Sequence, residues 1–377
     1  MFAHVTKKLN QLKEQGRYRK LTLPCGLDLS SNDYLGMAEH PAIREAARSY
    51  FDVAGVGEIG AGGSRLLRGH TEAHAELETF AAEAFGAKRT LFFSTGFQAN
   101  YAILTTLPER GDVVLYDEHV HASIRDGLVA SRAKSFKFSH NDMNALEDLL
   151  KRTRGKAQNI WVCAESVYSM DGDQAPISDL YKLAECFDAT LIIDEAHATG
   201  VLGEGGRGLA YDKIIKDYGY DRLVTLHTCG KAIGVAGAII CAREELIEYM
   251  INTSRPFIFS TAPMPVQAVL VHKSLGIILS TEGEGLRQNL AKICSHVQQL
   301  LGGEVSHGGH IVPLILGEDD RAVAIAGLLQ KQGFDIRAIR PPAVPSGTSC
   351  LRLSLSSKLN RQNIEDFVRA YKGVAFG

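Results

Sequence analysis

The stretch TLIIDEAHATG, at residues 190–200, places an acid and a histidine directly after a short apolar run. Residues 190–193 are apolar at positions of both parities, as in a strand that is covered on both faces. An acid at the end of such a strand points into the crevice beyond the sheet, where ligands bind in open α/β folds. Asp194 and His197 are therefore candidate site residues.

On either side of this stretch, short apolar runs alternate with amphipathic helical stretches. The other runs lie at residues 90–93, 113–116, 160–164, 223–226 and 238–240. This alternation predicts an α/β fold with a doubly wound, mostly parallel central sheet flanked by helices. One of the helices is predicted to begin after Thr71, a capping residue, and to end at Gly86.

The pattern of apolar and polar residues changes twice along the chain, which predicts three structural parts. Residues 1–44 are expected to form an N-terminal arm, and residues 45–275 are expected to form the large domain that holds the sheet. Residues 276–377 combine helical stretches with shorter strand-like runs at 311–315 and 351–355. They are expected to form a smaller C-terminal α+β domain.

Composition argues against several classes of protein. Of the 377 residues, 45% are hydrophobic and 22% are charged, an ordinary balance for a globular protein with a sizeable core. The formal net charge of −2 offers no electrostatic footprint for nucleic acid or an anionic membrane. Seven cysteines without a CxxC pair indicate a reducing compartment, and no apolar run is long enough to cross a membrane. The N-terminus lacks a secretory h-region, so a cytoplasmic location is expected.

A lysine follows the apolar run at residues 223–226. Lys231 stands among small residues in the stretch TCGKA, residues 228–232. A lysine just past a strand end can lie in a cleft, where partial loss of hydration frees its amine to form a Schiff base. Taken alone, the same stretch also fits a surface lysine in a loop.

Asp194 and its neighbours have two interpretations. The acid could pair with a protonated pyridine nitrogen of a cofactor, while His197 hydrogen-bonds the ring hydroxyl. Residues 194–197, DEAH, also match the box of a nucleic-acid-dependent ATPase, which requires a phosphate loop of the form GxxxxGK[ST]. Both Gly-Lys pairs of this chain are followed by alanine, which argues against an ATPase.

The turn after residues 90–93 has the sequence STGFQAN, residues 94–100. Small residues that open a helix leave backbone N–H groups free to bind a phosphate, which suits this turn. The glycine stretch at residues 60–65 is not a GxGxxG fingerprint, and no convincing strand precedes it. A nicotinamide-dependent dehydrogenase is therefore not favoured.

His119 and His121 form an HxH pair after the run at residues 113–116. No third ligand at a sensible spacing accompanies them, so no metal site is predicted. One imidazole could instead stack on a flat cofactor ring. A phosphate-type turn, a stacking histidine, a strand-end acid and a lysine, in this order, favour a single cofactor site.

Further stretches match one enzyme family in their order along the chain. They are residues 31–36 (SNDYLG), 62–65 (GGSR), 69–70 (GH), 165–173 (ESVYSMDGD), 194–200 (DEAHATG), 206–208 (GRG) and 230–232 (GKA). On these residues the chain resembles the α-oxoamine synthases, which are pyridoxal-phosphate enzymes of the fold-type I, aminotransferase-like class. The resemblance implies pyridoxal 5′-phosphate as the cofactor and a homodimer whose site lies at the interface.

The resemblance also implies a role for each matching site residue. Lys231 would hold the cofactor and then act as acid and base, and Asp194 would pair with the pyridine nitrogen. His197 and Ser169 would contact the ring oxygen, and His121 would stack on the ring. The implied phosphate ligands are Gly96, Phe97 and Thr228, with Ser260 and Thr261 reaching the phosphate of the partner subunit.

The stretch RPPAVPSGT, residues 340–348, is similar to one branch of this family. That branch joins L-alanine to a pimeloyl thioester of coenzyme A or of an acyl carrier protein, in biotin synthesis. Arg352 matches the arginine that holds the amino-acid carboxylate, a task that suits a guanidinium fork. Further substrate contacts are implied for Asn32, Arg340 and Arg19.

Two alternatives stay open. A sister enzyme of the family would use another amino acid or acyl chain, such as glycine with an acetyl group, and a substrate panel would separate it from the first reading. A non-catalytic relative would have lost the lysine, whereas Lys231, Asp194 and His197 are all present.

Overall fold

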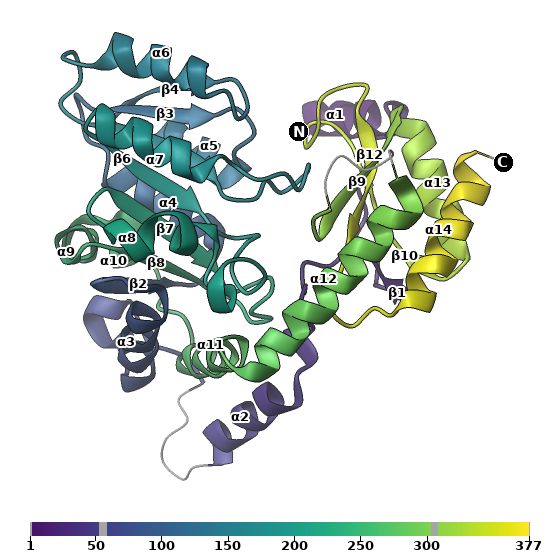
Figure 1. The fold of residues 1–377 in the computed structure, drawn as a ribbon, viewed down its shortest axis with the longest axis horizontal. Coiled ribbons are helices and arrows are strands. Elements are labelled where there is room, and N and C mark those ends of the chain that lie inside the picture. The colour runs from purple at the N-terminus through teal and green to yellow at the C-terminus, as the bar shows by residue number, and fades with distance from the viewer. Residues whose placement is uncertain (1, 53–58, 303–307, 377) are drawn as a thin grey trace. The chain divides into compact units, whose positions relative to one another are not determined.

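The computed structural model describes residues 2–52, 59–302 and 308–376 and divides into two compact units (Figure 1). The larger unit contains residues 35–168 and 174–287. The smaller unit contains residues 1–34, 169–173 and 288–377. The predicted division into an arm, a large domain and a small domain, with boundaries after residues 44 and 275, remains a prediction.

The larger unit is built on a sheet of seven strands, counted over the described residues. In spatial order they are β2 (Arg89–Phe93), β8 (Ala238–Ala242), β7 (Leu223–Thr228), β6 (Ala189–Asp194), β5 (Ile160–Glu165), β3 (Val113–Asp117) and β4 (Lys134–Phe138). Strand β8 runs antiparallel to both its neighbours, and the other pairs are parallel. The predicted mostly parallel sheet is therefore confirmed, and each predicted apolar run forms one of its strands.

The larger unit has helices that flank this sheet, as predicted, and further helices that pack on those helices. They are α2 (Pro41–Asp52), α3 (Glu72–Phe85), α4 (Gly96–Thr106), α5 (Ala122–Ala130), α6 (Met143–Thr153), α7 (Ile177–Cys186), α8 (Lys216–Tyr218), α9 (Glu244–Thr253), α10 (Arg255–Ile258) and α11 (Pro265–Ile278). Short 3-10 turns lie at Met37–Glu39 and Glu204–Gly206, and π turns at Arg65–Gly69 and Tyr211–Ile215. Helix α12 (Thr281–Leu301) contains the boundary between the units, after Arg287.

Helix α3 has the ends that the sequence predicts. Thr71 is its N-terminal cap, and its side chain and backbone are reciprocally bonded with His74. Gly86 ends the helix with a φ of +68°, in the left-handed region that favours glycine. The helix packs on β2, at the end of the strand order.

The core of the larger unit lies where α4 packs on the sheet. Ile103 and Leu104 of α4 are fully buried against residues of several strands, including Val114, Ile192 and Val224. These strand positions are apolar because both faces of the sheet are covered. The core thereby fixes the position of the first turn of α4 relative to the strand ends.

The smaller unit has two small sheets and three helices of its own among the described residues. An antiparallel sheet has the order β11 (Ala338–Ile339), β12 (Ser349–Ser354) and β9 (Ile311–Gly317), and β1 (Leu27–Asp28) pairs in parallel with β10 (Phe334–Asp335). The helices are α1 (Ala3–Glu14), α13 (Asp319–Lys331) and α14 (Arg361–Ala375). The predicted α+β texture of the C-terminal part is confirmed. In the described part of the chain, no helix is both long and apolar enough to cross a membrane.

Candidate active site

A cavity of about 140 Å³ lies at the carboxyl ends of strands in the larger unit. Its lining includes seven of the predicted site residues, namely Gly96, Phe97, His121, Asp194, His197, Thr228 and Lys231. Residues that the sequence did not single out complete it, namely Asn100, Ser123, Glu165, Ala196 and Leu226.

Sheet topology brings these residues together. Glu165, Asp194 and Thr228 are the last residues of β5, β6 and β7, which are neighbours in the sheet. Glu165 and Asp194 are direct partners in the parallel register. Because the carboxyl ends of parallel strands meet at one edge, side chains that are far apart in sequence line one crevice.

Lys231 lies in the turn between β7 and β8, and its amine faces a histidine. Its Nζ is 2.6 Å from Nε2 of His197, which is buried. Three backbone hydrogen bonds close the turn: the Cys229 N–H donates to the Gly237 carbonyl, the Val235 N–H to the Cys229 carbonyl and the Gly234 N–H to the Lys231 carbonyl. The turn therefore holds the amine in the cavity.

Asp194 is held by a donor on each carboxylate oxygen. Oδ1 accepts a hydrogen bond from the Ala196 N–H at 2.9 Å, and Oδ2 accepts one from Asn100 Nδ2 at 2.7 Å. The same Nδ2 lies 3.0 Å from Ser123 Oγ. Asn100 was not predicted as a site residue, because it lies inside a helix and its contact with Asp194 cannot be read from the neighbouring sequence. Its position in the turn STGFQAN was the one signal available.

Glu165 is a buried acid beside Asp194, and the sequence analysis did not identify it. Its Oε1 accepts a hydrogen bond from the His121 N–H at 2.5 Å. Burial, and then the neighbouring Asp194 carboxylate, raise the pKa of Glu165. Burial lowers the pKa of His121, whose Nδ1 lies 2.8 Å from Ser123 Oγ. Low hydration thus favours the uncharged forms of both residues beside Asp194.

The part of the cavity lined by Gly96, Phe97 and Thr228 suits an anion. Gly96 and Phe97 open helix α4, and the first N–H groups of a helix have no acceptor within it. Thr95 caps the helix by accepting from the Gln98 N–H at 3.1 Å. A Cβ on Gly96 would come within 3.1 Å of Thr228 Oγ1, so glycine keeps the space between helix and hydroxyl open.

Together these groups fit pyridoxal phosphate. Free N–H groups and the Thr228 hydroxyl suit its phosphate, the Asp194 carboxylate suits its protonated pyridine nitrogen, and the Lys231 amine suits its aldehyde. All of them line one cavity within one unit.

The two histidines of the HxH pair, His119 and His121, lie in different environments. His121 lines the cavity, whereas His119 stacks on His140 with ring centroids 4.0 Å apart. Nδ1 of His140 lies 2.9 Å from Asp117. Among residues 2–52, 59–302 and 308–376, no cluster of three or more His, Cys, Asp or Glu side chains has a geometry that could hold a metal ion.

The smaller unit holds a second group of predicted residues. The Arg352 guanidinium donates to Asn32 Oδ1 at 3.0 Å, to the Tyr34 hydroxyl at 3.3 Å and to the Ser169 carbonyl at 2.6 Å. A further bond, of 2.7 Å, reaches Ser354 Oγ. The structure thus brings Arg352, Asn32 and Ser169 together in a buried arrangement.

The remaining predicted residues lie outside these two groups. Arg340 donates to the carbonyl of Gly16, and Arg19 is exposed in the segment after α1. Ser260 and Thr261 follow α10 in the larger unit and do not line the cavity. Their predicted roles toward the acyl substrate and the partner's phosphate stay predictions.

Comparison with known proteins places these features in a family. The family model of aminotransferase class I and II matches residues 25–370. The 8-amino-7-oxononanoate synthase of Herminiimonas arsenicoxydans is 38% identical over 98% of this chain and 98% of its own length. The synthase of the same name from Geobacter sulfurreducens is 39% identical over 98% and 97%.

Solved structures agree. The serine palmitoyltransferase of Sphingomonas wittichii has a TM-score of 0.88 and 26% identity, over 99% of this chain and 96% of that one. An 8-amino-7-oxononanoate synthase from Francisella tularensis has a TM-score of 0.77 and 26% identity, over 92% and 97%. The predicted fold-type I architecture and the resemblance to α-oxoamine synthases are confirmed. By sequence and by fold, the chain belongs to the aminotransferase class I and II family.

Proposed function

We propose that this chain is a pyridoxal-phosphate-dependent acyltransferase that condenses L-alanine with a pimeloyl thioester. The products are 8-amino-7-oxononanoate, carbon dioxide and a free thiol, as in biotin synthesis. The observation that carries the proposal is the single cavity lined by Lys231, His197 and Asp194. Full-length relatives named 8-amino-7-oxononanoate synthase support this choice of reaction.

The residues of the cavity divide the work of proton transfer. When bound, pyridoxal phosphate supplies an electron sink for the carbanion formed at the amino-acid α-carbon. Lys231 Nζ would be the attachment point for the cofactor, and this amine would move the α-proton of the amino acid. Positioned proton transfer of this kind is worth about 10²–10⁴-fold in rate. Asp194 would keep the pyridine nitrogen protonated, His197 and Ser169 would hold the ring oxygen, and His121 would lie against the ring.

Other residues bind the anionic groups of cofactor and substrate. Gly96, Phe97 and Thr228 hold the phosphate of their own subunit. Arg352, supported by Asn32, binds the carboxylate of L-alanine through its guanidinium fork. We assign acyl-chain contacts to Arg340 and Arg19 on the resemblance alone.

The assembly that we propose is a homodimer. In it, Ser260 and Thr261 of one subunit reach the phosphate bound by the other. The thioester carrier is coenzyme A or an acyl carrier protein. We keep the cytoplasm as the proposed location, because scattered free cysteines suit a reducing compartment.

A substrate panel tests the proposal. Purified protein loaded with cofactor is mixed with L-alanine, glycine or L-serine and with pimeloyl, acetyl or longer acyl thioesters, on coenzyme A and on acyl carrier protein, and thiol release is followed. Turnover confined to L-alanine with the pimeloyl thioester is the expected result. Turnover with glycine and an acetyl thioester would instead assign the chain to a sister reaction. No turnover with any pair would overturn the proposal.

A further inference from the structure

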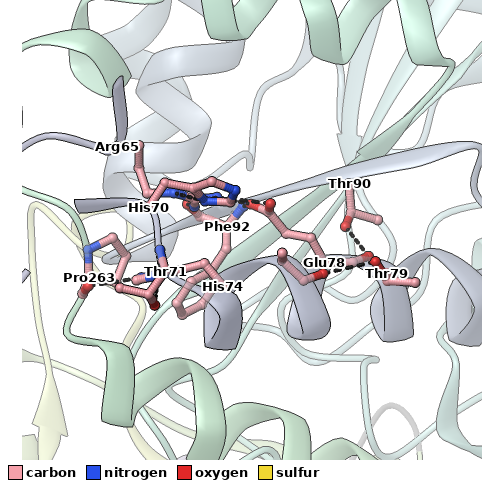
Figure 2. A network of polar contacts seen from close by, with 10 residues as sticks. Arg65, His70, Thr71, His74, Glu78, Thr79, Thr90, Phe92 and Pro263 are labelled. Carbon is pink, nitrogen blue, oxygen red and sulfur yellow. Dashed lines mark hydrogen bonds and ion pairs between the residues drawn. The ribbon is translucent and has the colours of Figure 1, made fainter. Parts of the chain in front are cut away.

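A buried ion pair flanks strand β2 in the larger unit, away from the cavity residues named above. Nη2 of Arg65 lies 3.0 Å and 2.9 Å from the two carboxylate oxygens of Glu78 in α3 (Figure 2). The exposed fractions of the two side chains are 5% and 16%. A charge pair withdrawn from water in this way costs desolvation energy, so the pair by itself is weak evidence of a stabilising role.

The pair is bonded to the backbone of β2. Arg65 Nη1 donates to the carbonyl of Phe92 at 3.3 Å, and the Phe92 N–H donates to Glu78 Oε1 at 2.8 Å. Strand β2 is last in the sheet order, with β8 on its other side. The ion pair therefore supplies the donor and acceptor that a further strand would supply. It does so two residues before the turn at 94–96 that opens α4.

The same network reaches the segment that contains Ser260 and Thr261. The Ala262 N–H donates to the Gly63 carbonyl at 2.9 Å, and Nε2 of His74 lies 3.0 Å from the Pro263 carbonyl (Figure 2). A carbonyl can only accept, so this Nε2 carries a proton. Burial, and then the neighbouring Arg65, lower the pKa of His74 to about 4, which leaves the ring neutral near pH 7.

Arg65 joins the two parts of this network. Its Nε and Nη2 lie 3.2 Å and 2.9 Å from Nδ1 of His70, which is next to Thr71, the cap of α3. Gly69 lies inside the loop, and a Cβ there would come within 2.6 Å of Ala262 Cβ. The loop at 63–71 is thus packed closely on the segment at 260–263, and its Arg65 is hydrogen-bonded to the backbone of β2.

We propose that the Arg65–Glu78 pair is a positioning device for the cofactor phosphate. It holds two phosphate-binding segments in place at once: the turn at 94–96, which serves its own subunit, and the segment at 260–263, which serves the partner. A planar guanidinium has five donors in a fixed geometry, which suits it to bind a carboxylate, a carbonyl and an imidazole together; a lysine ammonium has three donors and no such fork. This inference rests on the proposed function, since it concerns how tightly that cofactor binds.

The decisive variant is Glu78→Gln. Glutamine keeps an oxygen that can accept from the Phe92 N–H but removes the charge that fixes Arg65. Glu76→Gln makes the same charge change at an exposed position of the same helix and is the matched control. The dissociation constant of pyridoxal phosphate is measured by titrating the cofactor-free protein and following visible absorbance. The thermal midpoint of the cofactor-free protein and kcat at saturating cofactor are measured alongside.

If the pair has a positioning role, the dissociation constant of the cofactor should change and kcat at saturating cofactor should not. Glu78→Gln should weaken cofactor binding by about tenfold, as loss of a group that orients a ligand typically does. At saturating cofactor, kcat should stay within about twofold, because the pair touches no reacting atom. Glu76→Gln should leave both values unchanged.

Other outcomes would overturn the inference. An unchanged dissociation constant with a lowered thermal midpoint would make the pair purely structural. If Glu78→Gln does not fold, Arg65→Lys takes its place, and failure of both to fold would equally assign the pair to stability. Failure of the proposed function is separate, because it would appear as absence of turnover by the unsubstituted protein in the substrate panel, whatever its dissociation constant for pyridoxal phosphate.

Discussion

Lys231 and Asp194 owe their place in one cavity to strand ends, but they depend on neighbours for their orientation. The Lys231 amine meets the His197 imidazole at 2.6 Å, and Asp194 has a donor on each oxygen. Chemistry at such a site is sensitive to sub-ångström placement, since productive geometry must be held closely. Single substitutions can therefore separate residues that react from residues that orient.

Replacement of the lysine tests the reacting group. Lys231→Ala is expected to lower turnover by at least about 10²–10⁴-fold, because it removes the proton-transfer group and the anchor. Borohydride treatment of the loaded protein, followed by peptide mapping, should label Lys231 and should find no label at this position in the variant. Lys88→Ala, at an exposed position, should behave like the unsubstituted protein. Full turnover of Lys231→Ala would refute the mechanism.

Asn100 is expected to be an orienting residue. Asn100→Ala removes the 2.7 Å bond to Asp194 Oδ2, a hydrogen bond to a charged group worth about 1.5–3 kcal/mol. We expect kcat/KM to fall at least about tenfold and cofactor binding to weaken, as measured by steady-state kinetics and titration. Asn144→Ala, at an exposed position of α6, is the control. Unchanged kinetics would mean that the Ala196 N–H alone orients the carboxylate.

Among the cavity residues, Asp194 and Lys231 were predicted from the sequence, whereas Asn100 and Glu165 were missed. Asp194 and Lys231 follow apolar runs, so their position at or just past the end of a strand could be predicted from the sequence. Asn100 lies within a helix, and Glu165 is itself the last residue of a strand whose other residues are apolar. Asn100 looks like core locally, because its partner Asp194 comes from another part of the chain. Glu165, like Asp194, is an acid directly after an apolar run, so the rule that found Asp194 applies to it as well.

Among the elements, β7 carries a buried histidine that the mechanism does not use. Its ring nitrogens lie 2.8 Å from the hydroxyls of Thr199 and Thr225, and His227 stacks on Phe85 with ring centroids 3.8 Å apart. Burial lowers the pKa of His227 to about 3. The folded state therefore keeps this ring neutral well into the acid range.

This pKa predicts acid sensitivity with a definite sign. Between pH 6.5 and about 3, the unfolded chain binds a proton at His227 that the folded chain does not. Stability is therefore lost as pH falls through this window. At pH 5 the loss from this one residue is on the order of 2 kcal/mol.

The variant His227→Gln checks the sign. The difference in stability between it and the unsubstituted protein, followed by thermal midpoints, should shrink as pH falls from 7 to 5. His4→Gln, at an exposed position, should show no such trend. A difference that stays constant with pH would contradict the lowered pKa of His227.

Strand β4 marks the limit of sequence analysis at the level of elements. Its sequence KSFKF has only two apolar residues, and four of its five residues are exposed. It is an edge strand whose side chains are largely uncovered, so it lacks a continuous apolar run; β2, at the other edge, has such a run because α3 packs on it. The ends of α3, by contrast, were predictable because Thr71 and Gly86 act through local backbone chemistry.

At the scale of the whole molecule, each active site of the proposed dimer contains residues from both subunits. One subunit supplies Lys231, and the other supplies Ser260 and Thr261. Symmetric dimers exchange identical patches, so each subunit both gives and receives. Activity should then depend on residues that do not line their own cavity.

Mixed dimers test this sharing. Lys231→Ala and a Ser260→Ala/Thr261→Ala double variant are each expected to be weakly active. After unfolding and refolding together in equal amounts, half the dimers are mixed and one of their two sites is intact, so activity should recover to about a quarter. Refolding each variant alone is the control. No recovery, with mixed dimers demonstrated by mass, would place the partner's serine and threonine outside the site.

The two margins of the large sheet have a consequence for life in a crowded solution. Strand edges expose backbone groups that can recruit strands from other molecules. One margin of the described sheet, β4, presents exposed Lys134 and Lys137, and the other, β2, has the backbone of Phe92 already bonded to Arg65 and Glu78. Positive charge thus discourages intermolecular β-pairing at one margin, and a satisfied backbone discourages it at the other. Both features are of the kind by which folded proteins limit edge-to-edge pairing of their sheets.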